Sequence, residues 1–157
     1  MRMTLVIASA LTLLCISGPA PAQVLPNDTD LKAAFCAGVL KSSVEGSAKS
    51  QPPTDPAIAD LDKKSKEQLF AAQQRVLAYL MPRMQFVDQT SLMFALTEGG
   101  RAYEQNLTRW KECQWDPDSL AALAARDVKA MTAAMNSCMG PTGQRVRECY
   151  APSFLPF

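Results

Sequence analysis

The stretch CMGPTGQRVREC, residues 138–149, decides how the end of this chain folds. It has a cysteine at each end and a Gly140-Pro141 pair near its start, and a glycine followed by a proline is a common way for a helix to end. Thr142 can cap a short helix after that break. The stretch predicts that the chain turns back on itself. Its two cysteines could form a disulfide, part of a metal site or a redox pair.

The first 22 residues, MRMTLVIASALTLLCISGPAPA, are typical of a secretory signal peptide. Arg2 is followed by an apolar run from Leu5 to Ile16 and by small residues that end at Ala22. The run is about a dozen residues long, shorter than the roughly 20 that a membrane-spanning helix needs. We therefore expect residues 1–22 to be cleaved, the mature protein to be periplasmic or secreted, and no stable membrane insertion after cleavage.

The charge of the mature chain argues against a nucleic-acid partner. Cleavage after Ala22 removes Arg2 from the 16 basic residues, which leaves 15 to balance 15 acidic residues. Proteins that bind nucleic acid need an excess of basic residues to displace phosphate counterions. The remaining length, residues 23–157, suits one domain with a single core.

The sequence contains no histidine. Histidine is the usual general base at neutral pH and the commonest metal ligand, so Ser-His-Asp, Cys-His and typical catalytic zinc arrangements are excluded. Chemistry by paired carboxylates stays open, but the acidic residues fall mostly on expected solvated helix faces. We therefore expect a protein that is not an enzyme, with no catalytic residue, no cofactor and no metal site.

Caps, prolines and apolar spacing predict an all-α fold: a small disulfide-stapled helical bundle of about four main helices plus a short C-terminal helix. The clearest helix starts are Asp55-Pro56 and Asp116-Pro117, because proline suits the first helical position. No alternating strand pattern competes. The expected helices cover residues 31–43, 56–81, 88–115 and 117–138, with the short one between 142 and 150.

Three segments limit this prediction. Residues 45–55 contain glycine, serine and a Pro-Pro pair, which indicate an exposed loop. Gly99-Gly100 lie in the middle of the third helix, where they would either bend it or let a neighbouring backbone approach closely. The apolar tail, residues 151–157, must dock on this bundle or on a partner, and we favour docking on the bundle.

Four cysteines remain in the mature chain once Cys15 is removed, and an exported chain is expected to oxidise them. A straight helix from Pro117 to Cys138 is about 30 Å long, which would hold Cys113 and Cys138 too far apart for a bridge, since the two Cα atoms must come within about 7 Å. We therefore predict disulfides Cys138–Cys149 and Cys36–Cys113. A zinc site or a redox pair is less favoured because no C-x-x-C motif is present.

Two groups of side chains are candidate binding residues. The aromatic residues that could form an exposed contact patch are Trp110, Trp115, Tyr150, Phe154 and Phe157, since aromatic side chains dominate binding hot spots. Met131, Met135 and Met139 share one helix face, where thioethers can fill a core or bind Cu(I).

No motif in the sequence specifies a reaction or a ligand. The features above favour a small exported helical protein that acts by protein–protein contact, such as an inhibitor, an immunity-type neutraliser, or an assembly or chaperone factor. The alternative is a carrier of a small molecule or of Cu(I), which would use a cavity between helices or the methionine face.

Overall fold

The computed structural model describes residues 23–51 and 53–155, so the expected signal peptide lies outside the described residues. The described chain is all-α, as predicted, with an isolated β-bridge between Val24 and Val87. None of its helices is long and apolar enough to cross a membrane. The helices are α1 (Asp28–Lys49), α2 (Pro56–Leu80), α3 (Gln89–Cys113), α4 (Pro117–Ala124) and α5 (Val128–Glu148).

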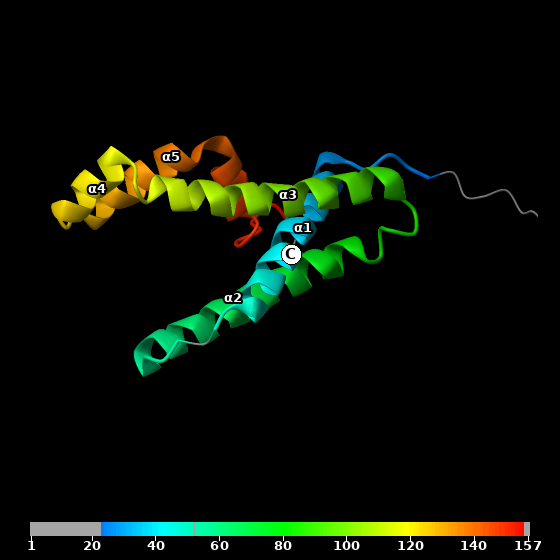
Figure 1. Cartoon of the computed structure of the whole chain (residues 1–157). Helices are drawn as coiled ribbons and strands as arrows, with labels where there is room; N and C mark the ends of the chain where they lie inside the picture. Colours follow the sequence, from blue (N-terminus) through cyan, green and yellow to red (C-terminus); the bar gives the residue numbers. More distant parts are fainter. Residues whose placement is uncertain (1–22, 52, 156–157) are drawn as a thin grey trace, which may run out of the picture.

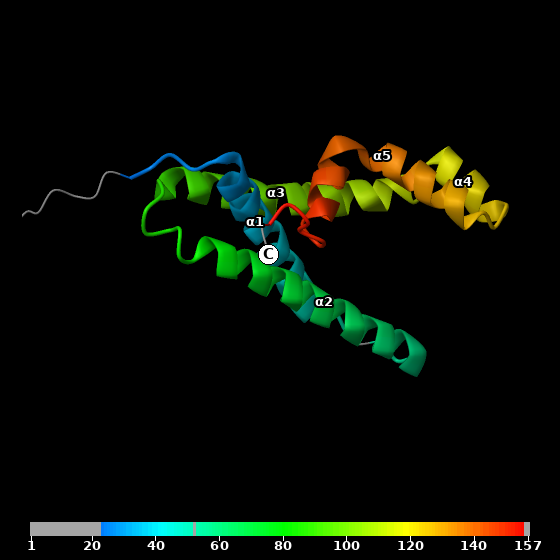
Figure 2. The same cartoon turned by 180° about the vertical axis from the view of Figure 1, so that it is seen from behind.

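The helices form two arms that diverge like a V (Figure 1). α1 and α2 run antiparallel as one arm. α3 forms the other arm, and the hairpin of α4 and α5 returns along the C-terminal half of α3, as the view from behind also shows (Figure 2). α1 crosses α3 where the arms meet, and the fully buried side chains Val39, Leu40, Val76 and Val146 belong to the core there.

Side-chain caps fix where the helices start. Asn27 caps α1 by accepting a hydrogen bond from the Asp30 amide, and Asp30 accepts one from the Asn27 amide, which completes a capping box. Asp55 and Asp116 cap α2 and α4, each followed by the predicted proline. These local signals are why the starts of α2 and α4 could be predicted from sequence.

Two glycines, Gly99 of the predicted pair and Gly38 of α1, explain how closely α1 and α3 cross. A Cβ atom on Gly99 would lie 1.9 Å from the Phe35 carbonyl oxygen, and one on Gly38 would lie 1.9 Å from the Leu96 carbonyl oxygen. Only glycine leaves room for the backbones to touch in this way. α3 runs through Gly99-Gly100 without a break, so the pair does not bend the helix. Gly99 is the member of the pair that permits the close approach of the α1 backbone.

The loop prediction was too long at its start. α1 continues to Lys49, so residues 45–49 are helical and the connection to α2 begins at Ser50. Gly46 is tolerated in the helix because Tyr103 packs over it: a Cβ atom there would lie 3.1 Å from the Tyr103 hydroxyl. Packing against a distant residue overrides the local helix-breaking signal.

The expected straight helix over residues 117–138 was wrong. α4 ends at Ala124, Arg126 adopts a left-handed conformation with φ of 55°, and Asp127 caps α5 by accepting a hydrogen bond from the Ala130 amide. The chain therefore reverses direction here. α5 also continues past Cys138, with a kink at Gly140, so the short helix expected from Thr142 onward is its last part.

The predicted cysteine pairing was also wrong, for the same reason. The four cysteines form disulfides Cys113–Cys138 and Cys36–Cys149, with Cα–Cα distances of 5.8 and 5.0 Å. The reversal between α4 and α5 brings Cys138 back beside Cys113, and the end of α5 then reaches Cys36 on α1. The cysteines are staples, as expected, and two disulfides fit an oxidising compartment.

A buried carboxylate joins the start of α1 to the end of α2. Asp30 is 2% exposed, accepts a hydrogen bond of 2.9 Å from the Tyr79 hydroxyl and lies 3.3 Å from the Arg83 guanidinium. Arg83 also stacks over the Tyr79 ring at 4.5 Å. Burial raises the pKa of Tyr79, and its hydrogen bond to Asp30 raises that pKa further. This network therefore links the start of α1 to the end of α2, close to where α1 crosses α3.

Candidate functional site

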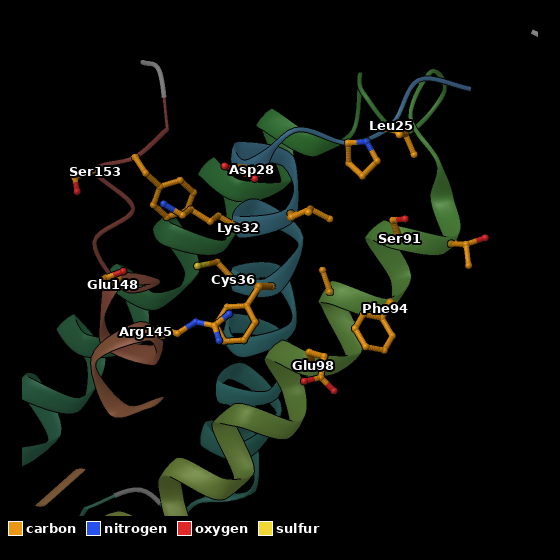
Figure 3. A pocket seen from close by; sticks show the side chains of 16 residues that line it. Leu25, Asp28, Lys32, Cys36, Ser91, Phe94, Glu98, Arg145, Glu148 and Ser153 are labelled. Carbon is orange, nitrogen blue, oxygen red and sulfur yellow. The ribbon is translucent and has the colours of Figure 1, made fainter. Parts of the chain in front are cut away.

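A pocket of about 1160 Å³ lies where the start of the described chain, α1, α3 and the C-terminal segment meet. This volume lies slightly above the roughly 300–1,000 Å³ of typical small-molecule sites. The side chains around it come from all four of these segments (Figure 3). Most of the lining surface is apolar, and seven of the 16 lining residues have apolar side chains: Leu25, Pro26, Leu31, Phe35, Phe94, Ala95 and Phe154.

The first described residues form one edge of the pocket because they are tied to the segment before α3. The Val24 amide donates to the Phe86 carbonyl oxygen at 2.9 Å, and the Asp88 amide donates to the Val24 carbonyl oxygen at 3.0 Å. These two bonds hold Leu25 and Pro26 beside the first turn of α3. Leu25 is 81% exposed, which shows that the pocket opens to solvent on this side.

α3 supplies the opposite edge. Asp88 caps this helix by accepting hydrogen bonds from Ser91, and these bonds hold the pKa of Asp88 below its usual range. Ser91, Phe94 and Glu98 then face the pocket from successive turns (Figure 3). Phe94 is 70% exposed, so its ring forms a rim and contributes little to the core.

The buried end of the pocket is rigid. Phe35 is buried, and the neighbouring Cys36 is covalently tied to Cys149 at the end of α5. Arg145 extends from α5 so that its guanidinium lies 4.4 Å from the centre of the Phe35 ring. The stacked ring and the disulfide fix Arg145 in place more firmly than a free surface arginine.

The pocket contains five charged side chains. Glu98 pairs with Arg101, and Glu148 accepts a hydrogen bond from the Gln144 amide group. Asp28 lies in the first turn of α1, where the helix dipole favours a negative charge. Lys32 and Arg145 form no ion pair within the described part of the chain.

The predicted aromatic patch is split. Trp110 and Trp115 lie near Cys113 at the end of α3. Cys113 is about 20 Å along the helix from Gly99, since an α-helix rises about 1.5 Å per residue. Tyr150 and Phe154 follow Cys149 and lie at the crossing, where the Tyr150 hydroxyl donates to Ser43 and Phe154 lines the pocket. Burial raises the pKa of Tyr150. Phe157 lies outside the described residues.

The tail docks on its own bundle as far as the structure describes it, because Leu155 is buried in the core cluster and Phe154 packs against it. The methionine face of α5 is partly core as well. Met139 is buried under the kinked end of the helix, where a Cβ atom on Gly143 would lie 2.7 Å from the Met139 Cβ. Met131 and Met135 are half-buried. Within residues 23–51 and 53–155, no group of three or more Cys, Asp or Glu side chains is placed to hold a metal ion.

Sequence reasoning missed most of the pocket. Phe94 carried a usable signal, since it lies on the opposite side of its helix from Leu92 and Leu96, and a large apolar residue away from the core face needs another partner. Leu25 had no such signal because its position depends on the Val24 bridge. Arg145 reaches the pocket because the Cys36–Cys149 disulfide holds the end of α5 against α1, and this pairing was not predicted from the sequence.

Comparison with family models, curated proteins and solved structures finds no match to this chain. The function must therefore be argued from the site.

Proposed function

We propose that this chain is an exported small-molecule-binding protein, and that the pocket between α1, α3 and the C-terminal segment holds its ligand. The observation that carries the proposal is a cavity of about 1160 Å³ with a mainly apolar lining and a few charged groups at defined places. Ligand sites in proteins have this composition, because apolar area gives affinity while a few polar groups set orientation.

The exposed part of the lining supports the same proposal. Leu25 and Phe94 are mostly exposed to water in the folded chain. Their apolar side chains therefore add little to its stability, because only buried apolar surface stabilises a fold. A ligand that covers both side chains would recover about 25 cal/mol for each Å² removed from water. The rigid end at Phe35 and the Cys36–Cys149 disulfide preorganises the pocket, which lowers the entropic cost of binding.

Export is part of this proposal. The first 22 residues match a signal peptide, and two disulfides suit the periplasm or the exterior of the cell. Intact mass measurement of protein from the exported fraction should give a chain that begins at Gln23. A chain that retains residues 1–22 would contradict export by cleavage.

Ligand binding can be tested with N-phenyl-1-naphthylamine, a neutral dye that fluoresces in apolar sites. The oxidised protein should bind it saturably at one site per chain. Phe94→Ser should weaken binding at least about tenfold, because the variant removes a rim aromatic whose burial contributes about 1.5–3 kcal/mol. Phe94 is exposed, so the fold should not change, and circular dichroism would check this.

Phe70→Ser is the matched control. Phe70 is an exposed phenylalanine on α2 that does not line this pocket. Its substitution should leave dye affinity unchanged. Absence of saturable binding, or equal losses in the two variants, would contradict the proposal.

Contact with another protein, the function that the sequence favours, is the second candidate. The supporting observation is the apolar face of α2: Leu69, Ala72 and Val76 are buried on it, whereas Ile58 and Leu61 on the same face are 54% and 67% exposed. The last turn of α1 lies beside residues 62–66 of α2, so Ile58 and Leu61 extend beyond the helix that covers the rest of the face. A partner with an apolar helix face would complete this arm.

Chemical cross-linking in the native compartment distinguishes this candidate. A defined heteromeric product that is lost in Leu61→Ser and kept in Phe94→Ser would support protein contact through α2. Loss in neither variant, or no defined product, would contradict it.

A further inference from the structure

We propose that the ligand is a single-chain amphiphile with a carboxylate head group, and that Arg145 and Lys32 bind this group. This inference rests on the proposed ligand-binding function and adds the chemical class of the ligand. Three features of the pocket carry it: the separation of apolar from cationic residues, the lack of an ion-pair partner for both cations, and the geometry of Arg145.

The pocket has an apolar edge and a cationic side. Leu25 and Phe94 lie toward the start of the described chain and α3, whereas Lys32 and Arg145 lie between α1 and the C-terminal segment (Figure 3). A ligand that satisfies both sides must be apolar at one end and anionic at the other.

The acidic residues of the pocket do not neutralise these cations. Glu98 is already engaged by Arg101, and Glu148 accepts a hydrogen bond from Gln144. Asp28 lies in the first turn of α1, where the helix dipole stabilises its negative charge. Glu98 pairs with a cation outside the pocket, and no ion pair in the described part of the chain joins Asp28 or Glu148 to Lys32 or Arg145. Both cations therefore stay available to an anionic group.

Arg145 is suited to a planar anion. Its guanidinium stacks on the Phe35 ring at 4.4 Å, which holds the planar group in one orientation while its N–H edge stays available. An arginine edge can donate two parallel hydrogen bonds to a carboxylate. Lys32 adds a second positive charge from α1, three residues before Phe35.

The experiment compares two ligands of equal chain length, decanoate and 1-decanol, as competitors of bound N-phenyl-1-naphthylamine on the oxidised protein. Decanoate should displace the dye at about tenfold lower concentration than 1-decanol, since a hydrogen bond to a charged group contributes about tenfold or more to affinity. Hexanoate should be weaker than decanoate by about fourfold for each methylene removed.

The variant Arg145→Gln combined with Lys32→Gln should remove the preference for decanoate over 1-decanol. The neutral dye reports in the same sample that the pocket is intact. The matched control is Arg147→Gln combined with Lys41→Gln, which removes one arginine from α5 and one lysine from α1 that do not line the pocket. This control should keep the preference.

The possible outcomes distinguish failure of the carboxylate assignment from failure of the ligand-binding function. Equal displacement by decanoate and 1-decanol in the unmodified protein would overturn the carboxylate assignment and leave the binding function intact. Dye binding that neither compound displaces would overturn the alkyl-chain assignment. Absence of saturable dye binding would overturn the binding function itself. A preference that the control variant also loses would show that net charge, not Arg145 and Lys32, selects the ligand.

Discussion

The two halves of α3 are held in different ways. The N-terminal half crosses α1 through direct backbone contact at Gly38 and Gly99, whereas the C-terminal half is tied to α5 by the Cys113–Cys138 disulfide. The crossing depends on the absence of side chains at two positions, and the pocket is built directly on it. The hairpin depends on a covalent bond and a left-handed residue, and it leaves large apolar side chains such as Leu123 and Val128 exposed.

The largest expected effect comes from comparing the two disulfides. Replacing Cys36 and Cys149 by alanine should lower the free energy of unfolding by about 5 kcal/mol, because that bridge spans 113 residues of sequence. Replacing Cys113 and Cys138 should cost about 3.5 kcal/mol, because that bridge spans 25 residues. Urea unfolding of both double variants would measure the difference, and the reverse order would contradict the assigned pairing.

The next effect tests the crossing alone. Gly99→Ala should destabilise the protein by about 3 kcal/mol, because the new Cβ atom would overlap the Phe35 carbonyl oxygen. Gly100→Ala is the control, since its Cβ atom would meet the Ser42 hydroxyl at 3.2 Å and lie in ordinary contact with the Gly38 carbonyl oxygen at 3.9 Å. The helix also gains about 1 kcal/mol of propensity. Equal stabilities of the two variants in urea would rule out the close crossing.

A smaller effect tests how the first arm is closed beside the crossing. Tyr79→Phe should lower the free energy of unfolding by about 2 kcal/mol, because it removes a hydrogen bond to the buried, charged Asp30. Tyr150→Phe should cost less than about 1 kcal/mol, since its hydroxyl donates to Ser43 over a longer distance of 3.4 Å. Thermal unfolding of the two variants would give the comparison, and a larger loss in Tyr150→Phe would contradict it.

A substitution at the reversal between α4 and α5 should stabilise the protein, unlike the substitutions above. Arg126→Gly should raise the free energy of unfolding by about 1 kcal/mol, because glycine adopts a left-handed conformation without a steric penalty. Lys129→Gly, three residues later in α5, should lower it by about 1 kcal/mol. If residues 117–138 formed one straight helix, both glycines would destabilise it.

The smallest effect is a decline in stability at alkaline pH. The pKa values of Tyr79 and Tyr150 are raised in the folded chain above their ordinary value of 10.0. Their contribution to stability is therefore complete below pH 10 and is lost as the pH rises through the folded-state values. The urea midpoint should fall as the pH rises above 10, and it should fall less in the double variant Tyr79→Phe, Tyr150→Phe.

The sequence predicted the elements whose signals are local. The starts of α2 and α4 follow from an aspartate cap and a proline, and the glycine pair of α3 left two interpretations, of which the structure selects one. The break at Arg126 had no glycine or proline to mark it, and alanine-rich flanking residues favour a continuous helix. That single missed turn changed the disulfide pairing, because Cys138 could reach Cys113 only after the reversal.

The pocket was less predictable than the helices, because each of its edges depends on contacts between distant segments. Leu25 is placed by the Val24 bridge to residues 86–88, and Arg145 is placed by the Cys36–Cys149 disulfide. In α4, Ser119 and Ala122 are buried while Leu120 and Leu123 are exposed, the opposite of what side-chain hydrophobicity alone would favour. Small side chains let α4 approach α5 closely, which periodicity of large residues does not reveal.

Native mass spectrometry of the oxidised protein, purified from the exported fraction without reductant or detergent, tests the central claim most directly. The account predicts one low-mass adduct per chain, which acidified organic solvent extracts as a carboxylic acid and which is absent from Phe94→Ser prepared in the same way. A chain that carries only a second polypeptide, or no adduct at all, would contradict it.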